Sequence, residues 1–164
     1  MSDLGSQTAL KAGDAKGLRI AVVVASFNSI YTRRLLNSAN ARLKGLGAKA
    51  PEVAWVPGAL ELPLAVQAFA KTGAYDAVIA IGCVIRGETT HYDLVSEGAA
   101  QGILQAGLST GIPAIFGVIT CENKAQVLAR CSGGSMDAGL HAANAAVSMA
   151  LLLRGLQKKK RKQR

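Results

Sequence analysis

The feature that most constrains the fold is an alternation of short apolar runs with segments of helical periodicity. Residues 18–25 (LRIAVVVA) form an almost continuous apolar, β-branched run, which is typical of a strand buried on both faces. Residues 29–46 follow with leucine and alanine at helical spacing. Together these two segments predict one β-α unit.

The same pattern recurs three more times along the chain. We predict further strands at 53–56, 75–81 and 114–120, and further helices at 59–72, 92–109, 123–130 and 137–157. Strands separated by helices of this length require crossover connections, which give a parallel sheet with helices on both faces. The predicted fold is therefore α/β: a three-layer α-β-α domain of the flavodoxin-like type, with a doubly wound, four-stranded parallel sheet.

Length and composition fit one such domain flanked by two short ends. The chain has 164 residues, of which 50% are hydrophobic and 18% charged, which excludes a disordered chain. We predict a flexible N-terminal arm at 1–17, a catalytic domain at 18–157 and a basic disordered tail at 158–164. Because the chain is apolar but only 4% aromatic, we also expect helix faces that pack against other subunits.

The net charge of +9 is concentrated in the predicted tail, which holds six of the 19 basic residues. The rest of the chain has 13 basic and 10 acidic residues, and this small excess of positive charge does not indicate a nucleic-acid-binding domain. The tail is most simply a solvated segment, with a weak contact to a polyanion as the alternative. No apolar run approaches about 18 residues, so we expect no membrane partner.

Several chemistries lack their sequence signals. The three cysteines are odd in number and have no zinc-ligand spacing, which argues against disulfides and metal and favours a reducing cytoplasm. Neither G-x-G-x-x-G nor G-x-x-x-x-G-K-[ST] is present, so we expect no nucleotide cofactor. Catalysis would depend on positioning and proton transfer.

Ligands of doubly wound sheets bind at the carboxyl ends of the strands, so the loops there are the candidate site. After the third predicted strand, residues 82–93 (GCVIRGETTHYD) combine hydroxyls, charges and His91 before a helix. Amides at a helix start can bind an anion, and an imidazole can transfer a proton near neutral pH. The alternative is an ordinary capping loop in which Thr89 or Thr90 caps the helix and His91 is merely exposed.

Three other positions allow two interpretations each. Glu61, between two prolines at a helix start, could bind a polyol or simply complement the helix dipole. Phe27, just after a strand, could stack on a flat heterocycle or pack under the next loop. His141, the only other histidine, is expected to be an exposed or core-edge residue of the last helix.

The chain resembles the lumazine synthase family over residues 18–156. The matching stretches are Phe27-Asn28, residues 54–65 (AWVPGALELPLA), 75–95 (YDAVIAIGCVIRGETTHYDLV), 111–123 (GIPAIFGVITCEN) and Arg130. The family condenses 5-amino-6-(D-ribitylamino)uracil with 3,4-dihydroxy-2-butanone 4-phosphate to 6,7-dimethyl-8-ribityllumazine, phosphate and water. The resemblance implies these small-molecule substrates, no cofactor, and a homo-oligomer of one or more pentamers with sites between subunits.

The resemblance also implies roles for individual residues. The ribitylaminouracil is expected to stack on Phe27 and to have its ribityl chain held by Ala59, Leu60 and Glu61. The backbone of Cys83, Val84 and Ile85 is expected to read the pyrimidine edge. Phe116 is expected to reach the site from the adjacent subunit. The butanone phosphate is expected to contact Glu88, Thr89 and Arg130, with Arg130 as the clamp on the phosphate. His91 is expected to be the general acid and base.

Two positions depart from the common pattern of the family. Leu60 stands where many members have an aromatic residue, and residues 131–139 (CSGGSMDAG) lack the lysines that many members carry there. The alternatives are an archaeal-type riboflavin synthase of the same fold, and a catalytically weak pentameric shell or scaffold protein. The complete loop at 82–93 argues against the first, and Phe27, Glu61, His91 and Arg130 together argue against the second.

Overall fold

The computed structural model describes residues 9–162, and its elements follow the predicted alternation. They are β1 (Ile20–Ala25), α1 (Ser29–Gly45), β2 (Glu52–Val56), a 3₁₀ turn η1 (Ala59–Glu61), α2 (Leu62–Lys71), β3 (Ala77–Ile85), α3 (His91–Thr110), β4 (Ala114–Cys121), α4 (Lys124–Cys131) and α5 (Ala138–Lys162). Within this part of the chain, no helix combines the length and apolar character that crossing a bilayer requires.

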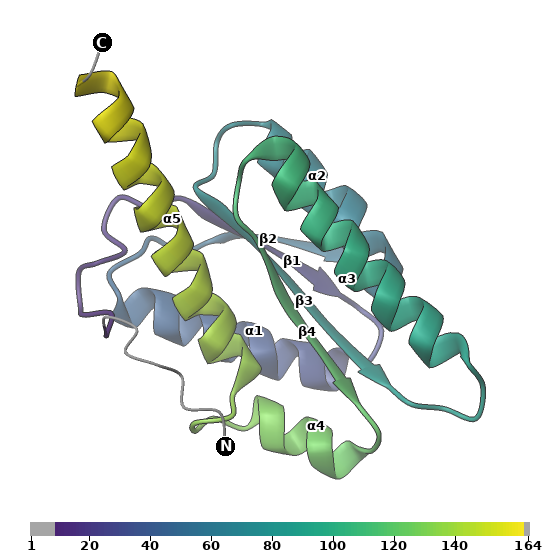
Figure 1. Cartoon of the computed structure of the whole chain (residues 1–164). Helices are drawn as coiled ribbons and strands as arrows, with labels where there is room; N and C mark the ends of the chain where they lie inside the picture. The colour runs from purple at the N-terminus through teal and green to yellow at the C-terminus, as the bar shows by residue number, and fades with distance from the viewer. Residues whose placement is uncertain (1–8, 163–164) are drawn as a thin grey trace.

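The four strands form one parallel sheet in the order β2-β1-β3-β4, with helices on both faces (Figure 1). Helices α1, α4 and α5 cover one face, whereas α2 and α3 cover the other. The predicted three-layer, four-stranded parallel fold is therefore confirmed.

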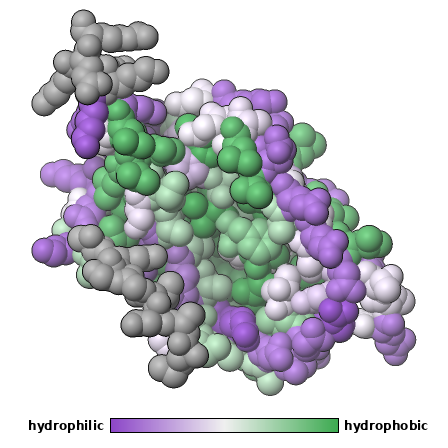
Figure 2. Space-filling model, viewed as in Figure 1, coloured by the Kyte–Doolittle hydropathy of each residue, from purple (hydrophilic) through white to green (hydrophobic). Residues whose placement is uncertain are grey.

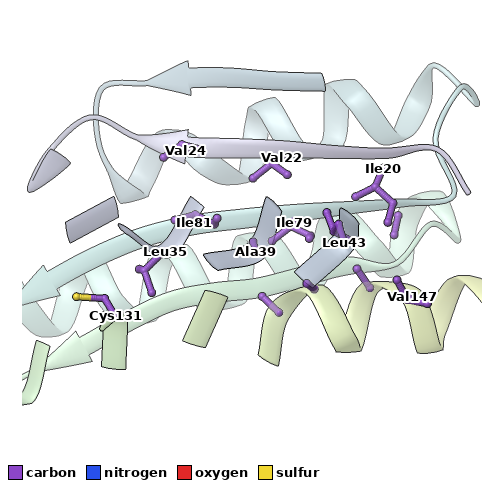
Figure 3. Packing of buried hydrophobic residues seen from close by; sticks show 14 of the residues in the cluster. Ile20, Val22, Val24, Leu35, Ala39, Leu43, Ile79, Ile81, Cys131 and Val147 are labelled. Atoms are coloured by element: carbon purple, nitrogen blue, oxygen red, sulfur yellow. The ribbon is translucent and has the colours of Figure 1, made fainter. Parts of the chain in front are cut away.

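The core is divided by the sheet into two apolar layers because successive strand residues point to opposite faces. Val22 and Val24 of β1 pack with Ile79 and Ile81 of β3 under α1 and α5 (Figure 3). The intervening Val23 lies in the other layer, under α2 and α3. Burial of each such side chain stabilises the fold by about 1.5–3 kcal/mol, which explains why every residue of β1 is apolar.

Strand β3 is longer than the sequence indicated. Its predicted end was residue 81, but β3 continues to Ile85 because β4 pairs with it up to Ile85↔Cys121. Pairing with β1 stops earlier, at Val24↔Ile81. Ala25 is the next residue of β1, and its carbonyl accepts a hydrogen bond from the Thr32 hydroxyl at 2.9 Å instead of one from β3. Residues 82–85, which we call the β3 overhang, therefore extend beyond β1.

Both ends of the described chain differ from the predicted arm and tail. Residues 1–8 of the arm lie outside the described residues, but residues 9–17 form turns against α1, with Gly13 and Ala15 donating to the carbonyl of Leu46 at 3.0 and 2.9 Å. Helix α5 continues to Lys162, past the predicted end near residue 157, because long cationic side chains are good helix formers. Residues 163–164 lie outside the described part.

Candidate functional site

A cavity of about 520 Å³ opens at the carboxyl ends of β1 and β3, between η1 and the start of α3. This is the end of the sheet at which the sequence placed the site. The cavity brings together most of the predicted site residues: Phe27, Ala59, Leu60, Glu61, Cys83, Val84, Ile85, Thr89 and His91.

An aromatic ring stands at the cavity because of the turn that follows β1. Phe27 is 71% exposed, and its backbone N–H donates to the carbonyl of Pro57 at 2.9 Å. The next residue, Asn28, has a φ of 59°, a left-handed conformation that asparagine tolerates better than most residues. Its side-chain amide donates to the carbonyl of Cys83 at 2.9 Å. The backbone that carries the ring is thus held on both sides, while the ring itself is exposed, so packing under the next loop, the alternative for Phe27, does not occur.

The β3 overhang presents backbone groups to the cavity. Adjacent strand residues direct their amide and carbonyl groups to opposite sides, so Val84 faces β4 whereas Cys83 and Ile85 face the side that β1 has left. Within the described residues, this edge has no strand partner, and Asn28 occupies one carbonyl of it. Alternating donors and acceptors along such an edge match the hydrogen-bonding edge of a heterocycle. Neither Asn28 nor Thr32 was assigned a role from the sequence, although an asparagine directly after a strand is a recognised signal for a left-handed turn.

The Glu61 carboxylate turns back over the Pro57-Gly58 turn. A Cβ at position 58 would lie 3.0 Å from Glu61 Oε2, so any larger residue there would press on the carboxylate and shift it. Glu61 is exposed and, among the described residues, its side chain has no hydrogen bond or ion pair. Its carboxylate oxygens can therefore accept hydrogen bonds from ligand hydroxyls.

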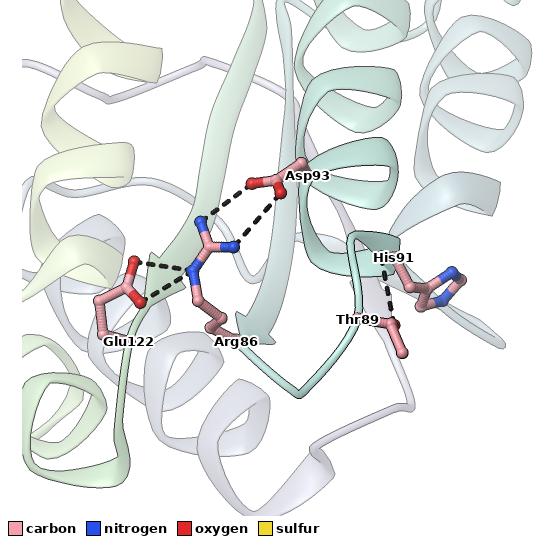
Figure 4. A network of polar contacts seen from close by, with 5 residues as sticks. All are labelled: Arg86, Thr89, His91, Asp93 and Glu122. Carbon is pink, nitrogen blue, oxygen red and sulfur yellow. Dashed lines mark hydrogen bonds and ion pairs between the residues drawn. The ribbon is translucent and has the colours of Figure 1, made fainter.

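The start of α3 is fixed by an arginine between two carboxylates (Figure 4). Arg86 pairs with Asp93 at 2.9 Å and with Glu122 at 2.8 Å, and its guanidinium lies 4.1 Å from the centre of the Tyr92 ring. The hydrogen bonds that Arg86 donates to Asp93, and then to Glu122, raise the pKa of Arg86 above its ordinary value. Because its charge is satisfied in this way, Arg86 ties α3 to the end of β4 rather than supplying an anion site.

His91 is the first residue of α3 and is exposed. Its backbone N–H lies 3.4 Å from Thr89 Oγ1, and its imidazole points away from Arg86 (Figure 4). No hydrogen bond to the imidazole occurs within residues 9–162, so both ring nitrogens are available to a ligand in the cavity.

The three cysteines of the chain are buried and free. Burial raises the pKa of Cys83 to about 12, so the thiol in the cavity wall stays protonated at neutral pH and is a poor nucleophile. The other two cysteines are also buried and free, and burial raises their pKa as well. Over residues 9–162, no three His, Cys, Asp or Glu side chains come together as metal ligands would.

Three predicted site residues lie elsewhere. Phe116 and Arg130 line a second cavity of about 580 Å³, formed by β4, α4 and the start of α5. Glu88 is exposed in the loop before α3 and lines neither cavity. The described chain thus presents the predicted site in two parts that share no residue.

Comparison with known proteins agrees with this geometry. Residues 17–154 match the family model for 6,7-dimethyl-8-ribityllumazine synthase. A chloroplastic 6,7-dimethyl-8-ribityllumazine synthase of Spinacia oleracea is 42% identical over 139 residues, which are 84% of this chain and 63% of the relative. One of Arabidopsis thaliana is 45% identical over 139 residues, which are 84% of this chain and 61% of the relative. The chain therefore spans about three fifths of the length of these relatives.

Proposed function

The chain belongs to the 6,7-dimethyl-8-ribityllumazine synthase family, and on that premise we propose that it is a transferase of riboflavin biosynthesis. It condenses 5-amino-6-(D-ribitylamino)uracil with 3,4-dihydroxy-2-butanone 4-phosphate to give 6,7-dimethyl-8-ribityllumazine, phosphate and water. The observation that carries the proposal is the single cavity that unites an aromatic face, a free carboxylate, an imidazole and an open strand edge.

Each part of the ribitylaminouracil has a matching feature in that cavity. The flat ring stacks on Phe27, whose side chain is exposed and whose backbone turn is held by hydrogen bonds to Pro57 and from Asn28 to Cys83. The ring edge bonds to the backbone of Cys83 and Ile85, and the ribityl hydroxyls donate to Glu61, with Ala59 and Leu60 beside the chain. These contacts orient the free amino group of the pyrimidine toward the start of α3.

His91 moves protons in a sequence of steps that needs no covalent enzyme intermediate. The amine attacks the ketone of the second substrate and one water leaves, which gives an imine. Loss of phosphate, rearrangement to a carbonyl and attack by the ribityl-bearing nitrogen close the ring, and a second water leaves. The imidazole can take and return the proton at each step, while positioning of both substrates supplies much of the acceleration. We therefore expect His91→Ala to lower kcat by about a hundredfold, the low end of what a general acid and base contributes, and not to abolish it.

We further propose that the complete site is shared between subunits of a homopentamer or a multiple of pentamers. In support, Phe116 and Arg130 lie in a cavity separate from the one that contains Phe27 and His91. The edge strand β4 also carries apolar side chains on the face between α3 and α5, where Figure 2 shows apolar atoms gathered. Exposed large residues on this face and its flanking helices are Leu104, Leu108, Phe116, Met149 and Leu152. A neighbouring subunit seated there would bury them and bring its own half of the site.

The first test is the absorbance change when purified protein is mixed with both substrates. We expect lumazine to form faster than without enzyme, and Arg130→Ala to raise the KM for the butanone phosphate with little change in the KM for the ribitylaminouracil. Absence of product above the uncatalysed rate would refute the enzyme and favour the scaffold alternative.

The second test asks whether sites are shared between subunits. We expect His91→Ala and Arg130→Ala proteins, unfolded and refolded together in equal amounts and assayed at low butanone phosphate, to exceed the mean activity of the two proteins refolded separately, because about one quarter of the shared sites receive both intact halves. Native mass spectrometry of the same samples reports the number of subunits. No gain on mixing, in samples that do form mixed oligomers, would place the whole site within one subunit.

The cytoplasm remains our proposed compartment. Three free, buried cysteines fit a reducing environment, whereas the two relatives compared above are named as chloroplastic. Fractionation of the native cells, with the activity assayed in each fraction, tests this.

A further inference from the structure

Three polar side chains meet in the second cavity, and the proposed function uses only one of them. Arg130 lies in the last turn of α4, Ser135 in the turn that follows, and His141 in the first turn of α5. All three line the cavity of about 580 Å³. The turn reverses the chain through Gly133 and Gly134, whose φ values of 85° and 87° favour glycine.

The orientation of His141 is fixed by its own turn. Its Nε2 lies 2.7 Å from the backbone carbonyl oxygen of Ser135, which can only accept, so Nε2 carries a proton and donates it. This leaves Nδ1 without a partner among the described residues, on a ring that lines the cavity. When an anion enters, Nδ1 can take up a proton and donate it to the anion.

The charges around the cavity favour an anion. Its lining includes Arg130 and His141 and no carboxylate. Arg130 donates to the carbonyl of Gln126 at 3.0 Å and, within the described residues, has no acidic partner, in contrast to Arg86 and Arg154.

Asp137, which lies between the lining residues Met136 and Ala138 in the sequence, does not itself line this cavity. It is buried, and its carboxylate accepts from Ser38 Oγ of α1 at 2.6 Å, from the amide of Gly133 at 2.8 Å and from the amide of Leu140 at 3.0 Å. These three donors satisfy its oxygens, and among the described residues Asp137 forms no ion pair with Arg130.

We propose that His141, with the Ser135 hydroxyl, completes the binding site for the phosphate group of the four-carbon substrate beside Arg130. The inference rests on the proposed function for the identity of that substrate. Residues 131–139 contain no lysine that could bind the phosphate. His141, in the first turn of α5, would supply a cationic donor in place of such a lysine. A guanidinium, an imidazolium and a hydroxyl together give a phosphate dianion several charge-assisted hydrogen bonds.

Three variants test the proposal. His141→Gln keeps a polar side chain but cannot become a cation, and His141→Lys carries a permanent charge. Lys44→Gln is the control, because it removes a cation from an exposed position of α1 outside both cavities. We expect His141→Gln to raise the KM for the butanone phosphate by about tenfold and to leave the KM for the ribitylaminouracil and the thermal midpoint unchanged. His141→Lys should restore the KM, and Lys44→Gln should change neither KM.

Calorimetric titration with inorganic phosphate gives a readout that does not need turnover. We expect the wild type to bind phosphate and His141→Gln to bind it about tenfold more weakly. If the wild type binds phosphate but forms no lumazine, the proposed function fails while the anion site stands. If the wild type forms lumazine and His141→Gln has unchanged phosphate affinity, or raises both KM values equally, the role of His141 is refuted.

Discussion

Helix α5 passes so close to α1 that one glycine on α5 cannot be replaced without moving a helix. A Cβ built on Gly139 would lie 2.2 Å from the backbone carbonyl oxygen of Leu35, in the middle of α1. On the same helix, Gly155 has no heavy atom within 4 Å of the corresponding position. We therefore predict that the same change, glycine to alanine, has opposite effects on stability at the two sites.

The magnitudes follow from two known terms. Alanine favours the helix over glycine by about 1 kcal/mol, and at Gly155 nothing opposes this gain. At Gly139 the Cβ must retreat from 2.2 Å to at least 3.0 Å from an oxygen that no side-chain rotation can move, so α5 and α1 must separate. Such overpacking costs about 1–3 kcal/mol or more. We expect Gly155→Ala to stabilise by about 0.5–1 kcal/mol and Gly139→Ala to destabilise by about 1–2 kcal/mol.

Urea unfolding followed by circular dichroism measures both effects, at one protein concentration because association contributes to stability. Gly139→Ala should lower the midpoint and Gly155→Ala should raise it, with similar slopes. A Gly139→Ala protein as stable as Gly155→Ala would show that the two helices are not packed backbone to backbone, and the reasoning would be wrong.

Three further predictions concern the site. Since burial raises the pKa of Cys83 to about 12, its thiol stays protonated until strongly alkaline pH, and mass spectrometry should find alkylation at about pH 8 at least roughly a hundredfold slower in the folded than in the urea-unfolded protein. Glu61→Gln should raise the KM for the ribitylaminouracil by about tenfold, because an amide is a weaker acceptor than a carboxylate, and leave the KM for the other substrate unchanged in steady-state assays. Arg86→Gln should lower kcat by about fivefold with little change in thermal midpoint, because it frees the start of α3, which carries His91, while removing only exposed ion pairs. Equal loss of kcat and thermal midpoint would mean that Arg86 acts on the whole fold.

The order of elements could be predicted from the sequence because each strand and helix has its own periodic signal. The β1 run, for instance, is apolar at all six positions since both faces are covered. The length of β3 could not be predicted, because Gly82 was interpreted as the start of a loop. Its continuation depends on β4, a segment far away in the sequence that pairs with it up to Cys121.

The candidate site is predictable where local sequence signals place its residues and not where distant segments do. Phe27, Glu61 and His91 each follow a strand or begin a helix, so the position of their loops was sufficient to bring them into one cavity. Arg86 lies in the same predicted loop as His91, but its partner Glu122 lies 36 residues away, and the sequence gives no sign of this pairing. His141 likewise lines a cavity only because the turn between α4 and α5 brings it beside Arg130 and β4, which the sequence does not show.

The β3 overhang has a consequence for how the site can change over generations. On the proposed function, the pyrimidine is read by main-chain atoms of Cys83 and Ile85, which every amino acid except proline supplies in the same form. Point mutations at these positions can therefore alter packing without altering the groups that read the ring. Side-chain substitutions at these positions therefore leave the preference for the heterocycle unchanged. A new ring specificity would require a change in the length of β3, a substitution of Asn28, or a proline in the overhang.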